Sequence, residues 1–503
     1  MARMEPASKF EGTAPTEAAP GVARIDVDAV SSKEARSLYA ARQPIYPRRA
    51  KGTFRTAKWM VMAVTLGIYY LLPWVRWDRG PGLPDQAFLL DFAHQRLFFG
   101  PIEIWPQELY FITGILILSA LGLFLVTALL GRMWCGYTCP QTVWTDLMIA
   151  VERFWQGDRS ARMRLDKGPL NFEKIWKKTA THITWLAISL ATGGVLVFYF
   201  RDAPTLATEL VTGEAPIVAY VFMGVFTATT YLLGGFAREQ VCIYMCPWPR
   251  IQAAMFDADS LLVSYRGWRG EPRQPHKKGQ TWIGRGDCID CKACVAVCPM
   301  GIDIRDGAQL ECIQCALCID ACDDIMDKVG RPHGLIAYET FRNMDVTSEA
   351  ERKPVRLVRP RTILYSAMIA VVTGIMAWAW IARAPVEISV IEDRNPLFVR
   401  LSDGGIRNGY TLKILNKTHG EQHFAIRADG IVGSRIAVVG HENGGAEVPV
   451  EPNSLRAIKI YVTVPTEARA ALIGSSTPLR FVVTDLATGN DVIRDTSFRS
   501  PSP

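Results

Sequence analysis

Eight cysteines form two runs with identical spacing. The first run is Cys288, Cys291, Cys294 and Cys298, and the second is Cys312, Cys315, Cys318 and Cys322. Each run reads C-x2-C-x2-C-x3-C, a spacing that binds a pair of 4Fe–4S clusters, with the fourth cysteine of each run bound to the cluster of the other run. The spacing therefore predicts one cluster held by Cys288, Cys291, Cys294 and Cys322, and a second held by Cys312, Cys315, Cys318 and Cys298.

Zinc is the alternative metal, because four thiolates also suit it. Zinc sites are built from paired C-x2-C units, however, and do not require a third and fourth cysteine at this spacing in two runs. We expect three cysteines of each run to lie on a tight loop and the fourth to start a short helix directed at the other cluster. Pro299 follows Cys298 whereas Asp323 follows Cys322, a difference that alters the local turn but not the ligands.

The other four of the 12 cysteines form two C-x3-C-P motifs, Cys135–Pro140 and Cys242–Pro247, each just past the end of an apolar segment. Residues four apart share a face of a helix, so each pair would present two sulfurs side by side. The proline would interrupt the helical hydrogen bonds. Two such hairpins, packed as a pseudo-repeat, would bring four sulfurs together.

A site made of these thiolates favours a soft cation, and Cu(I) is the obvious candidate. The candidate copper ligands are Cys135, Cys139, Cys242 and Cys246, with Met133 and Met245 as candidate thioether helpers. The alternative is simple packing, because cysteine is a common small buried residue. Two matching pairs beside a cluster-binding segment favour a metal or redox role.

Other redox groups leave no signature in the sequence. His182 lies at the edge of an apolar segment and His94 in a loop, so a haem held by two histidines within the bilayer is not predicted. No G-x-G-x-x-G follows a strand and no Walker loop occurs, so neither a nucleotide nor a flavin site is predicted. Electrons must therefore come from a partner or from a quinol.

The elements that position these cysteines include long apolar blocks. The chain has 503 residues, of which 49% are hydrophobic and 21% charged, and the charges lie between the apolar blocks. This pattern excludes a plain cytosolic enzyme and a disordered chain. The net charge of +7 is modest, and basic residues cluster beside apolar blocks, so they indicate membrane-flanking charge rather than a nucleic-acid surface.

Five stretches are long enough to span a bilayer. They are Ala57–Trp77, Leu109–Leu130, Thr181–Phe200, Ala215–Ala237 and Thr362–Ala382. Basic residues concentrate before the first span and between the second and third: Arg48, Arg49, Lys51, Arg55, Lys58, Arg159, Arg162, Arg164, Lys167, Lys174, Lys177 and Lys178. The loops at the other ends of the spans contain few, so the N-terminus and Arg238–Arg361 are predicted to be cytoplasmic and the C-terminal domain to lie outside.

Short alternating runs separated by turn residues begin at Val386. The runs are Val386–Ile391, Tyr410–Leu415, His423–Ile426, Ile458–Val464, Leu479–Val483 and Asp491–Arg494. Their spacing predicts an antiparallel all-β sandwich of immunoglobulin type. No catalytic constellation is visible there, so a structural or partner-binding role is expected.

The predicted fold is therefore a multi-domain membrane protein: a five-helix transmembrane bundle, a bacterial-type two-cluster ferredoxin domain and an immunoglobulin-like sandwich. The expected parts are a disordered cytoplasmic tail (1–45), four membrane helices with both C-x3-C-P motifs (46–261), the ferredoxin-like domain (262–361), the fifth helix (362–382) and the sandwich (383–503).

At these motifs the chain resembles the CcoG/FixG/RdxA family of membrane-bound cytochrome c oxidase accessory proteins. The matching stretches are Trp134–Thr145, Glu239–Arg250, Met255–Tyr265, Asp287–Gly330 and Asn408–Lys417. The resemblance extends from about Tyr46 to the C-terminus. It departs at Trp248 and Pro249, where a different aromatic residue and a small residue are expected.

The resemblance implies a multi-pass protein of the bacterial inner membrane, with a periplasmic C-terminal domain, that supports assembly of the cbb-type cytochrome c oxidase. Its implied partners are a copper-transporting P-type ATPase, copper chaperones and oxidase assembly factors. It further implies a cupric reductase, in which Cys135, Cys139, Cys242 and Cys246 bind copper as catalytic residues and the clusters deliver the electron. The electron donor is unknown, and a homodimer stays open.

Two other functions remain open. One is a quinol-linked electron-transfer module coupled to a cation-pumping ATPase, and the other is a redox-sensing assembly scaffold that is not an enzyme. Copper bound stoichiometrically by the membrane cysteines would favour the reductase. Reduction of the clusters by quinol would favour the second function, and oxidase assembly by a variant without cluster cysteines would favour the third.

The charge distribution predicts the topology. Alkaline phosphatase fused after Pro503 should be active, because that end is expected in an oxidising exterior compartment. The same reporter fused near Gly279 should be inactive, and a cytoplasmic reporter there should be active. The opposite result at either site would require a different number of spans.

Overall fold

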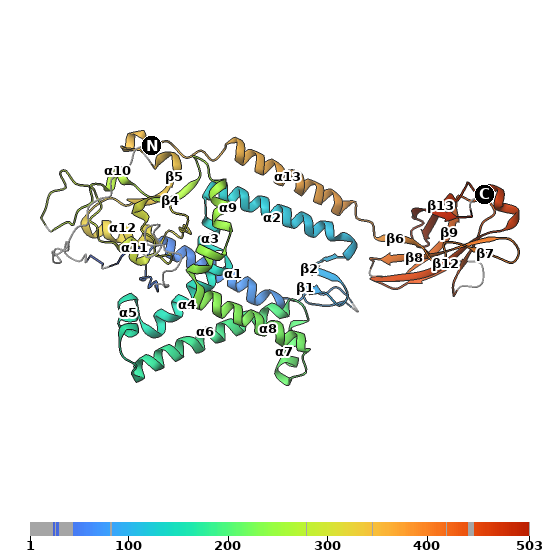
Figure 1. Cartoon of the computed structure of the whole chain (residues 1–503), viewed down its shortest axis with the longest axis horizontal. Helices are drawn as coiled ribbons and strands as arrows, with labels where there is room; N and C mark the ends of the chain where they lie inside the picture. Colours follow the sequence, from blue (N-terminus) through green and yellow to red (C-terminus); the bar gives the residue numbers. More distant parts are fainter. Residues whose placement is uncertain are drawn as a thin grey trace. The chain divides into compact units, whose positions relative to one another are not determined.

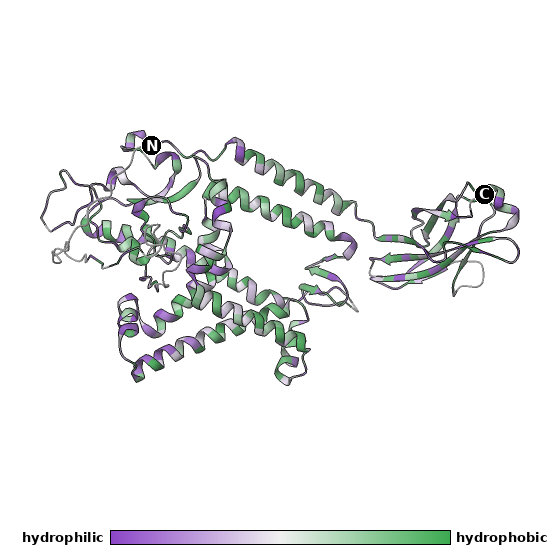
Figure 2. Ribbon diagram, viewed as in Figure 1, coloured by the Kyte–Doolittle hydropathy of each residue, from purple (hydrophilic) through white to green (hydrophobic). Residues whose placement is uncertain are grey.

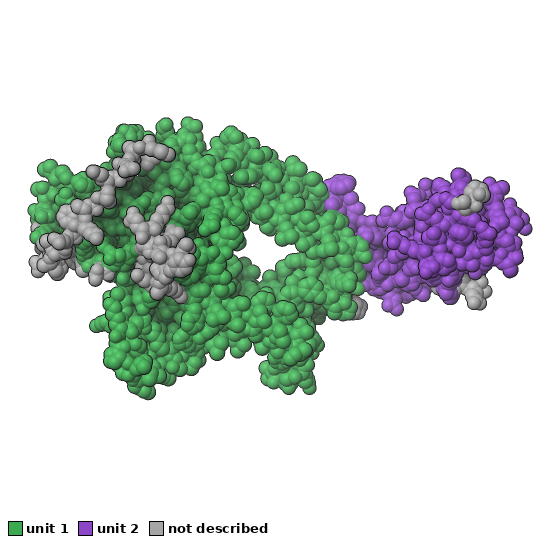
Figure 3. All heavy atoms as spheres, in the orientation of Figure 1, with its two compact units in different colours: residues 1–376 green, residues 377–503 purple. Residues whose placement is uncertain are grey.

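The computed structural model describes residues 24–25, 27–29, 44–80, 83–277, 279–344, 346–418, 420–440 and 447–501. The chain forms two compact units, Met1–Met376 and Ala377–Pro503, coloured separately in Figure 3. The boundary falls within helix α13 (Pro360–Ile381). Most of the predicted N-terminal tail, residues 1–45, lies outside the described residues.

Among the described residues, four helices are long and apolar enough to cross a membrane. They are Pro106–Leu130 (η2 and α2), Phe172–Phe198 (α6), Ile217–Ala237 (α8 and η3) and Pro360–Ile381 (α13). Figure 2 shows the apolar colouring along these helices. They coincide with four of the five predicted spans. The remaining predicted span, Ala57–Trp77, coincides with α1 (Thr53–Leu71), which is not among the four, and a fifth span stays a prediction.

Shorter elements connect these helices in the first unit. They are η1 (Leu72–Trp74), the antiparallel sheet of β1 (Phe88–Asp91), β2 (Arg96–Phe99) and β3 (Ile102–Ile104), then α3 (Met133–Tyr137), α4 (Pro140–Gln156), α5 (Arg159–Lys167), α7 (Ala203–Thr212), η4 (Val241–Met245) and α9 (Trp248–Met255).

Helices α6 and α8 pack closely because Gly193 lets the backbones approach; a Cβ there would lie 2.7 Å from the Met223 carbonyl oxygen. Helix α4 joins them through Trp185, whose Nε1 donates to the Met148 carbonyl oxygen (3.0 Å).

In the sequence, the eight-cysteine segment lies between β4 (Leu261–Tyr265) and β5 (Ile336–Thr340). These two strands pair with each other as a two-stranded antiparallel sheet. Between the strands lie α10 (Gly267–Gly270), α11 (Ala293–Val297), η5 (Ile304–Asp306) and α12 (Leu317–Val329), with η6 (Phe341–Asn343) and η7 (Glu349–Glu351) after them (Figure 1). Asp320 of α12 accepts hydrogen bonds from the backbone N–H groups of Phe54 (3.1 Å) and Arg55 (2.7 Å). The carboxylate thereby satisfies free donors at the start of α1 and joins the cysteine segment to that helix.

The second unit is the predicted β-sandwich. One sheet has the strand order β10 (Arg435–Val438), β12 (Ser454–Val464), β8 (Ile406–Asn416) and β6 (Val386–Glu392), and β7 (Val399–Arg400) also pairs with β8. The other sheet has the order β11 (Glu447–Val450), β9 (Gln422–Asp429), β13 (Ser476–Asp485) and β14 (Asp491–Arg499). The short helix η8 (Thr466–Ala471) precedes β13. Side chains such as Tyr410, Leu412 and Phe481 fill the space between the sheets. The Tyr410 hydroxyl donates to the Ser497 carbonyl oxygen of the opposite sheet (2.8 Å).

The six predicted strands correspond to β6, β8, β9, β12, β13 and β14. The sequence did not reveal β7, β10 and β11, because strands of two to four residues are too short to show alternation and β11 contains Pro449.

Candidate functional site

Two cavities in the segment that connects β4 to β5 are lined by cysteines. One is lined by Cys288, Cys291, Cys294 and Cys322. The other is lined by Cys298, Cys312, Cys315 and Cys318, with Cys294 also on its wall. Each cavity therefore combines three cysteines of one run with the fourth of the other, which is the arrangement that exchange of the fourth ligand requires. We call them the first and second cluster cavities.

The two loops around these cavities repeat the same backbone shape. Asp290 and Lys292 have φ values of 53° and 56°, and the equivalent residues Gln314 and Ala316 have 54° and 59°. Four non-glycine residues in the left-handed region are uncommon and indicate loops held in a demanding conformation.

The expectation that the fourth cysteine starts a helix is wrong. Helices α11 and α12 begin one residue before the third cysteine of each run, Cys294 and Cys318. Cys298 follows the end of α11, and Cys322 lies one turn inside α12. The left-handed residue before each helix turns the chain sharply enough for the helix to begin at that point.

The donor set of the two cavities fits iron–sulfur clusters. All eight cysteines are free thiols, and none is an exposed residue. Burial raises the pKa of Cys312 to about 11 and that of Cys298 to about 12. Buried thiols of this kind become stable thiolates when a metal binds them, and four thiolates in one cavity are the usual ligands of a 4Fe–4S cluster.

The four membrane-edge cysteines come from two segments of the chain, one for each C-x3-C-P motif. Cys135 lies in α3 and Cys139 precedes α4, whereas Cys242 lies in η4 and Cys246 ends it. Cys139 and Cys246 have extended ψ values of 127° and 120°, so the two cysteines of a motif do not share a helix face as expected. Pro140 instead begins the following helix, a position where its missing N–H costs nothing.

These four cysteines nevertheless lie near one another. The pKa of Cys242 is raised to about 12, first by burial and then by Cys139, Cys135 and Cys246. The pKa of Cys135 is raised to about 12 by burial and by Cys139. Among the described residues, no three His, Cys, Asp or Glu side chains are close enough to hold a single metal ion. Of the two methionines proposed as helpers, Met245 is exposed (64%).

Helix α3 lies directly against the loop of the second cluster cavity. A Cβ on Gly136 would stand 2.7 Å from the Ile313 carbonyl oxygen and 3.1 Å from Cys315 Cα. The backbone N–H of Arg132 donates to Oε1 of Gln314 (2.8 Å). Cys135 and Cys242 therefore pack against the same apolar group that contains Cys312, Cys315 and Cys318.

Two polar residues that fix this junction, Arg132 and Gln252, could not be recognised from any sequence motif. The Arg132 guanidinium donates to the carbonyl oxygens of Cys312 (3.3 Å) and Pro249 (2.6 Å), and so ties the second cluster loop to α9. Buried Gln252 of α9 accepts from Cys135 Sγ (3.2 Å) and donates to Thr127 of α2 (3.3 Å). Arg132 is close in sequence to the first C-x3-C-P motif, and Gln252 is close to the second. Only the fold brings Arg132 to Pro249 and Gln252 to Cys135.

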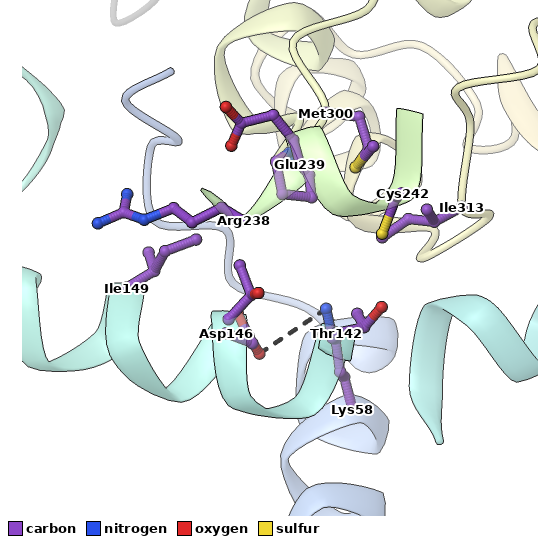
Figure 4. Close-up of a pocket in the computed structure, with 11 residues that line it drawn as sticks. Lys58, Thr142, Asp146, Ile149, Arg238, Glu239, Cys242, Met300 and Ile313 are labelled. Carbon is purple, nitrogen blue, oxygen red and sulfur yellow. Dashed lines mark ion pairs between the residues drawn. The ribbon is translucent and has the colours of Figure 1, made fainter. Parts of the chain in front are cut away.

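A small pocket opens between the membrane cysteines and the second cluster loop (Figure 4). Its wall includes Cys242 and Met300, whose side chains both face the pocket, and the ammonium of Lys58. Lys58 Nζ lies 3.8 Å from Asp146, and Arg55 donates to both oxygens of the same carboxylate at 2.8 and 2.9 Å. Two buried cations thus hold the pKa of Asp146 below its ordinary value despite its burial.

Two family models match the cysteine-rich parts of the chain and one matches its end. A 4Fe–4S dicluster domain matches residues 237–341, and a 4Fe–4S binding domain matches residues 112–156. The Ig-like fold at the C-terminus of FixG matches residues 376–501.

Proteins from two bacteria are similar over most of the chain. "Nitrogen fixation protein FixG" of Rhizobium meliloti is 50% identical, over 88% of this chain and 91% of that protein. "Protein RdxA" of Cereibacter sphaeroides is 52% identical, over 89% and 95%. A crystal structure of a FixG-related protein from Vibrio parahaemolyticus covers 24% of this chain and 98% of its own, at 24% identity and a TM-score of 0.20.

The fold and the site together define a membrane-bound iron–sulfur protein of electron transport, with an Ig-like C-terminal domain. The chain belongs to the FixG/RdxA family.

The close approach of α3 predicts the effect of adding one methyl group. Gly136→Ala should lower the free energy of unfolding by about 1–3 kcal/mol, because its Cβ would meet backbone atoms that have little room to move. Thermal unfolding in detergent, followed by helical signal and by iron–sulfur absorbance, measures the change.

Gly122→Ala in α2 is the matched control, because a Cβ there has nothing within 4 Å. It should be neutral or stabilise by up to about 1 kcal/mol. Equal unfolding midpoints for the two variants would mean that the α3 contact is not tight.

Proposed function

We propose that the protein is a cupric reductase, which passes electrons through two 4Fe–4S clusters to Cu(II) held by the membrane-edge cysteines. The observation that carries this proposal is the junction between α3 and the second cluster loop. There Cys135 and Cys242 pack in one apolar group with Cys312, Cys315 and Cys318.

The cluster ligands follow from the two cavities. Cys288, Cys291, Cys294 and Cys322 would hold the first cluster, and Cys312, Cys315, Cys318 and Cys298 the second. When bound, each cluster would accept and release one electron. Cys294 lines both cavities, so the two sites lie side by side, and the second lies next to the membrane cysteines.

The reaction at the membrane cysteines would be a one-electron transfer. Cu(II) gains one electron and becomes Cu(I), the electron donor loses one, and no bond to carbon or hydrogen forms or breaks. Thiolates favour the soft Cu(I) product, so Cys135, Cys139, Cys242 and Cys246 would draw the reaction forward.

The proposal also includes the location of the protein in the cell and its partners. We propose that the cysteine segment is cytoplasmic and the sandwich periplasmic at the inner membrane, from the basic residues before the first predicted span and between the second and third. Copper-transporting ATPases and chaperones, which handle Cu(I), are the partners that this product suits. They would connect the protein to assembly of a copper-containing oxidase.

Replacement of the two cysteine classes should separate the two functions. The variant with serine at Cys135, Cys139, Cys242 and Cys246 should lose tight Cu(I) binding, because hydroxyl oxygens are too hard for this ion. It should keep about eight irons per chain, as expected for two 4Fe–4S clusters. Competition with a Cu(I) chelator and anaerobic metal analysis are the measurements.

The reciprocal variant, Cys291→Ser with Cys315→Ser, should lose cluster iron and still bind copper without reducing it. Stopped-flow mixing of the reduced protein with Cu(II) measures the reduction. The copper assignment fails if the four-serine variant keeps native copper affinity, or if it loses its iron.

A further inference from the structure

The loop Pro272–Gly286 carries charge of one sign only. It contains four Lys or Arg residues and one His, and no Asp or Glu. Among the described residues of the loop, Arg273, Lys277 and the tip residue Ile283 are exposed, and Ile283 is exposed by 90%. Lys278 lies outside the described residues.

This loop is built onto the first cluster cavity. The backbone N–H of Gln274 donates to the carbonyl oxygen of Cys288 (3.2 Å), and that of Gly286 donates to Pro272 (3.0 Å) and closes the loop. Trp282 packs against the apolar group that includes Cys288, Cys291 and Cys322. One aromatic side chain thus connects the loop surface to the first cavity.

Contacts within the loop hold its shape without neutralising it. The His276 ring stacks on Trp282, with centroids 4.2 Å apart, and Arg285 donates to Gln280 (2.9 Å) and to the carbonyl oxygen of Pro275 (2.7 Å). Within the described part of the chain, no carboxylate forms an ion pair with Lys277 or Arg285.

The acidic groups around the loop already have partners, and one of them, Glu271, is paired with Arg273 of the loop itself. Glu271 lies 3.7 Å from Arg273, and Asp287 pairs with Arg269 and Arg331. On α12, Asp324 pairs with Lys328, Asp327 with His333, and Asp323 accepts from the backbone N–H of Gly334. On the far side of the first cluster loop, Asp28 pairs with Lys292. With Glu271 offsetting Arg273, the other three Lys and Arg residues still leave the loop with a net positive charge.

We propose that the described part of the Pro272–Gly286 loop, with Arg273, Lys277 and Ile283 exposed, is the docking surface for an acidic, soluble electron-carrier protein that reduces the first cluster. The proposal rests on the proposed electron flow toward the membrane cysteines. Since the second cavity faces those cysteines, electrons must enter at the first cavity, and the loop is the basic surface attached to it. A basic rim around one exposed apolar side chain is a typical surface for a transient protein complex.

The transfer balances as a single electron. The reduced carrier loses one electron and the oxidised first cluster gains one, with no bond made or broken and no proton required. The positive loop steers the acidic carrier, and this steering weakens as salt rises.

The test uses the full-length, iron-loaded protein in nanodiscs of neutral lipid, without copper. An oxidised, strongly acidic two-cluster ferredoxin is titrated by calorimetry at several salt concentrations. The double variant Arg273→Glu with Lys277→Glu should bind it at least about tenfold more weakly at low salt, with a smaller salt dependence. Arg164→Glu with Lys167→Glu, which reverses two exposed charges on α5, is the matched control and should bind as the wild type does.

Two further arms separate folding from docking. Ile283→Ser should weaken binding without changing its salt dependence, and because the side chain is exposed by 90% the fold should not change. Iron–sulfur absorbance should fall more slowly with the reduced ferredoxin in the loop variant, whereas photoreduced deazaflavin, a small reductant, should reduce every variant at one rate.

Equal ferredoxin binding by the loop variant and the wild type would overturn the proposal. So would rapid reduction of the wild type by a quinol in the nanodisc without any ferredoxin binding, or loss of binding to anionic lipid vesicles as the only effect of the loop variant. The four-serine variant should dock and accept electrons normally, so a failure of the copper proposal would leave this result unchanged.

Discussion

The structure depends on a backbone-to-backbone contact between a membrane-edge helix and an iron–sulfur loop. Helix α3 can approach the Cys312–Cys315 loop because residue 136 has no Cβ. A similar approach occurs at Gly131, with a φ of 60°, where a Cβ would stand 2.4 Å from the Leu261 carbonyl oxygen. Electron transfer slows steeply with distance, so the packing of Cys135 and Cys242 in one apolar group with Cys312, Cys315 and Cys318 favours redox coupling between the two cysteine groups.

Buried charge holds the helices on either side of this contact. Glu152 of α4 pairs with Arg162 of α5 (2.8 Å) and with Arg238 beyond η3, and Asp146 of α4 pairs with Arg55 and Lys58 of α1. Each of these carboxylates has two cationic partners. Removal of a partner would be costly, because it would leave a buried charge uncompensated. Basic residues that predict the cytoplasmic side from the sequence are thus also structural in the fold.

The cysteine segment is joined to the membrane helices at several places in the chain. Asp320 binds the start of α1, and Arg132 binds the second cluster loop and α9. Among the described residues, the apolar group around the first cavity includes none of the membrane cysteines, and Trp282 of the basic loop packs against it. The two cavities therefore differ in surroundings although their loops share one backbone shape.

The sequence by itself determined which chemistry is present. Cysteine spacing predicted the two groups of four, since C-x2-C-x2-C-x3-C leaves one local loop geometry, and hydropathy predicted four helices that the structure contains. Alternation of side chains likewise predicted the six longer strands of the sandwich. These are short-range patterns, in which each residue's role depends on neighbours a few positions away.

Only the tertiary structure decided how these parts meet. The backbone at Cys139 and Cys246 is extended rather than helical, so the pairing of four sulfurs depends on how α3, α4, η4 and α9 pack. Gln252, Arg132 and Lys58 face cysteine sites that are more than 100 residues away from them in the chain. No local pattern encodes such contacts, because they follow from the packing of the whole unit and the need to pair every buried polar group.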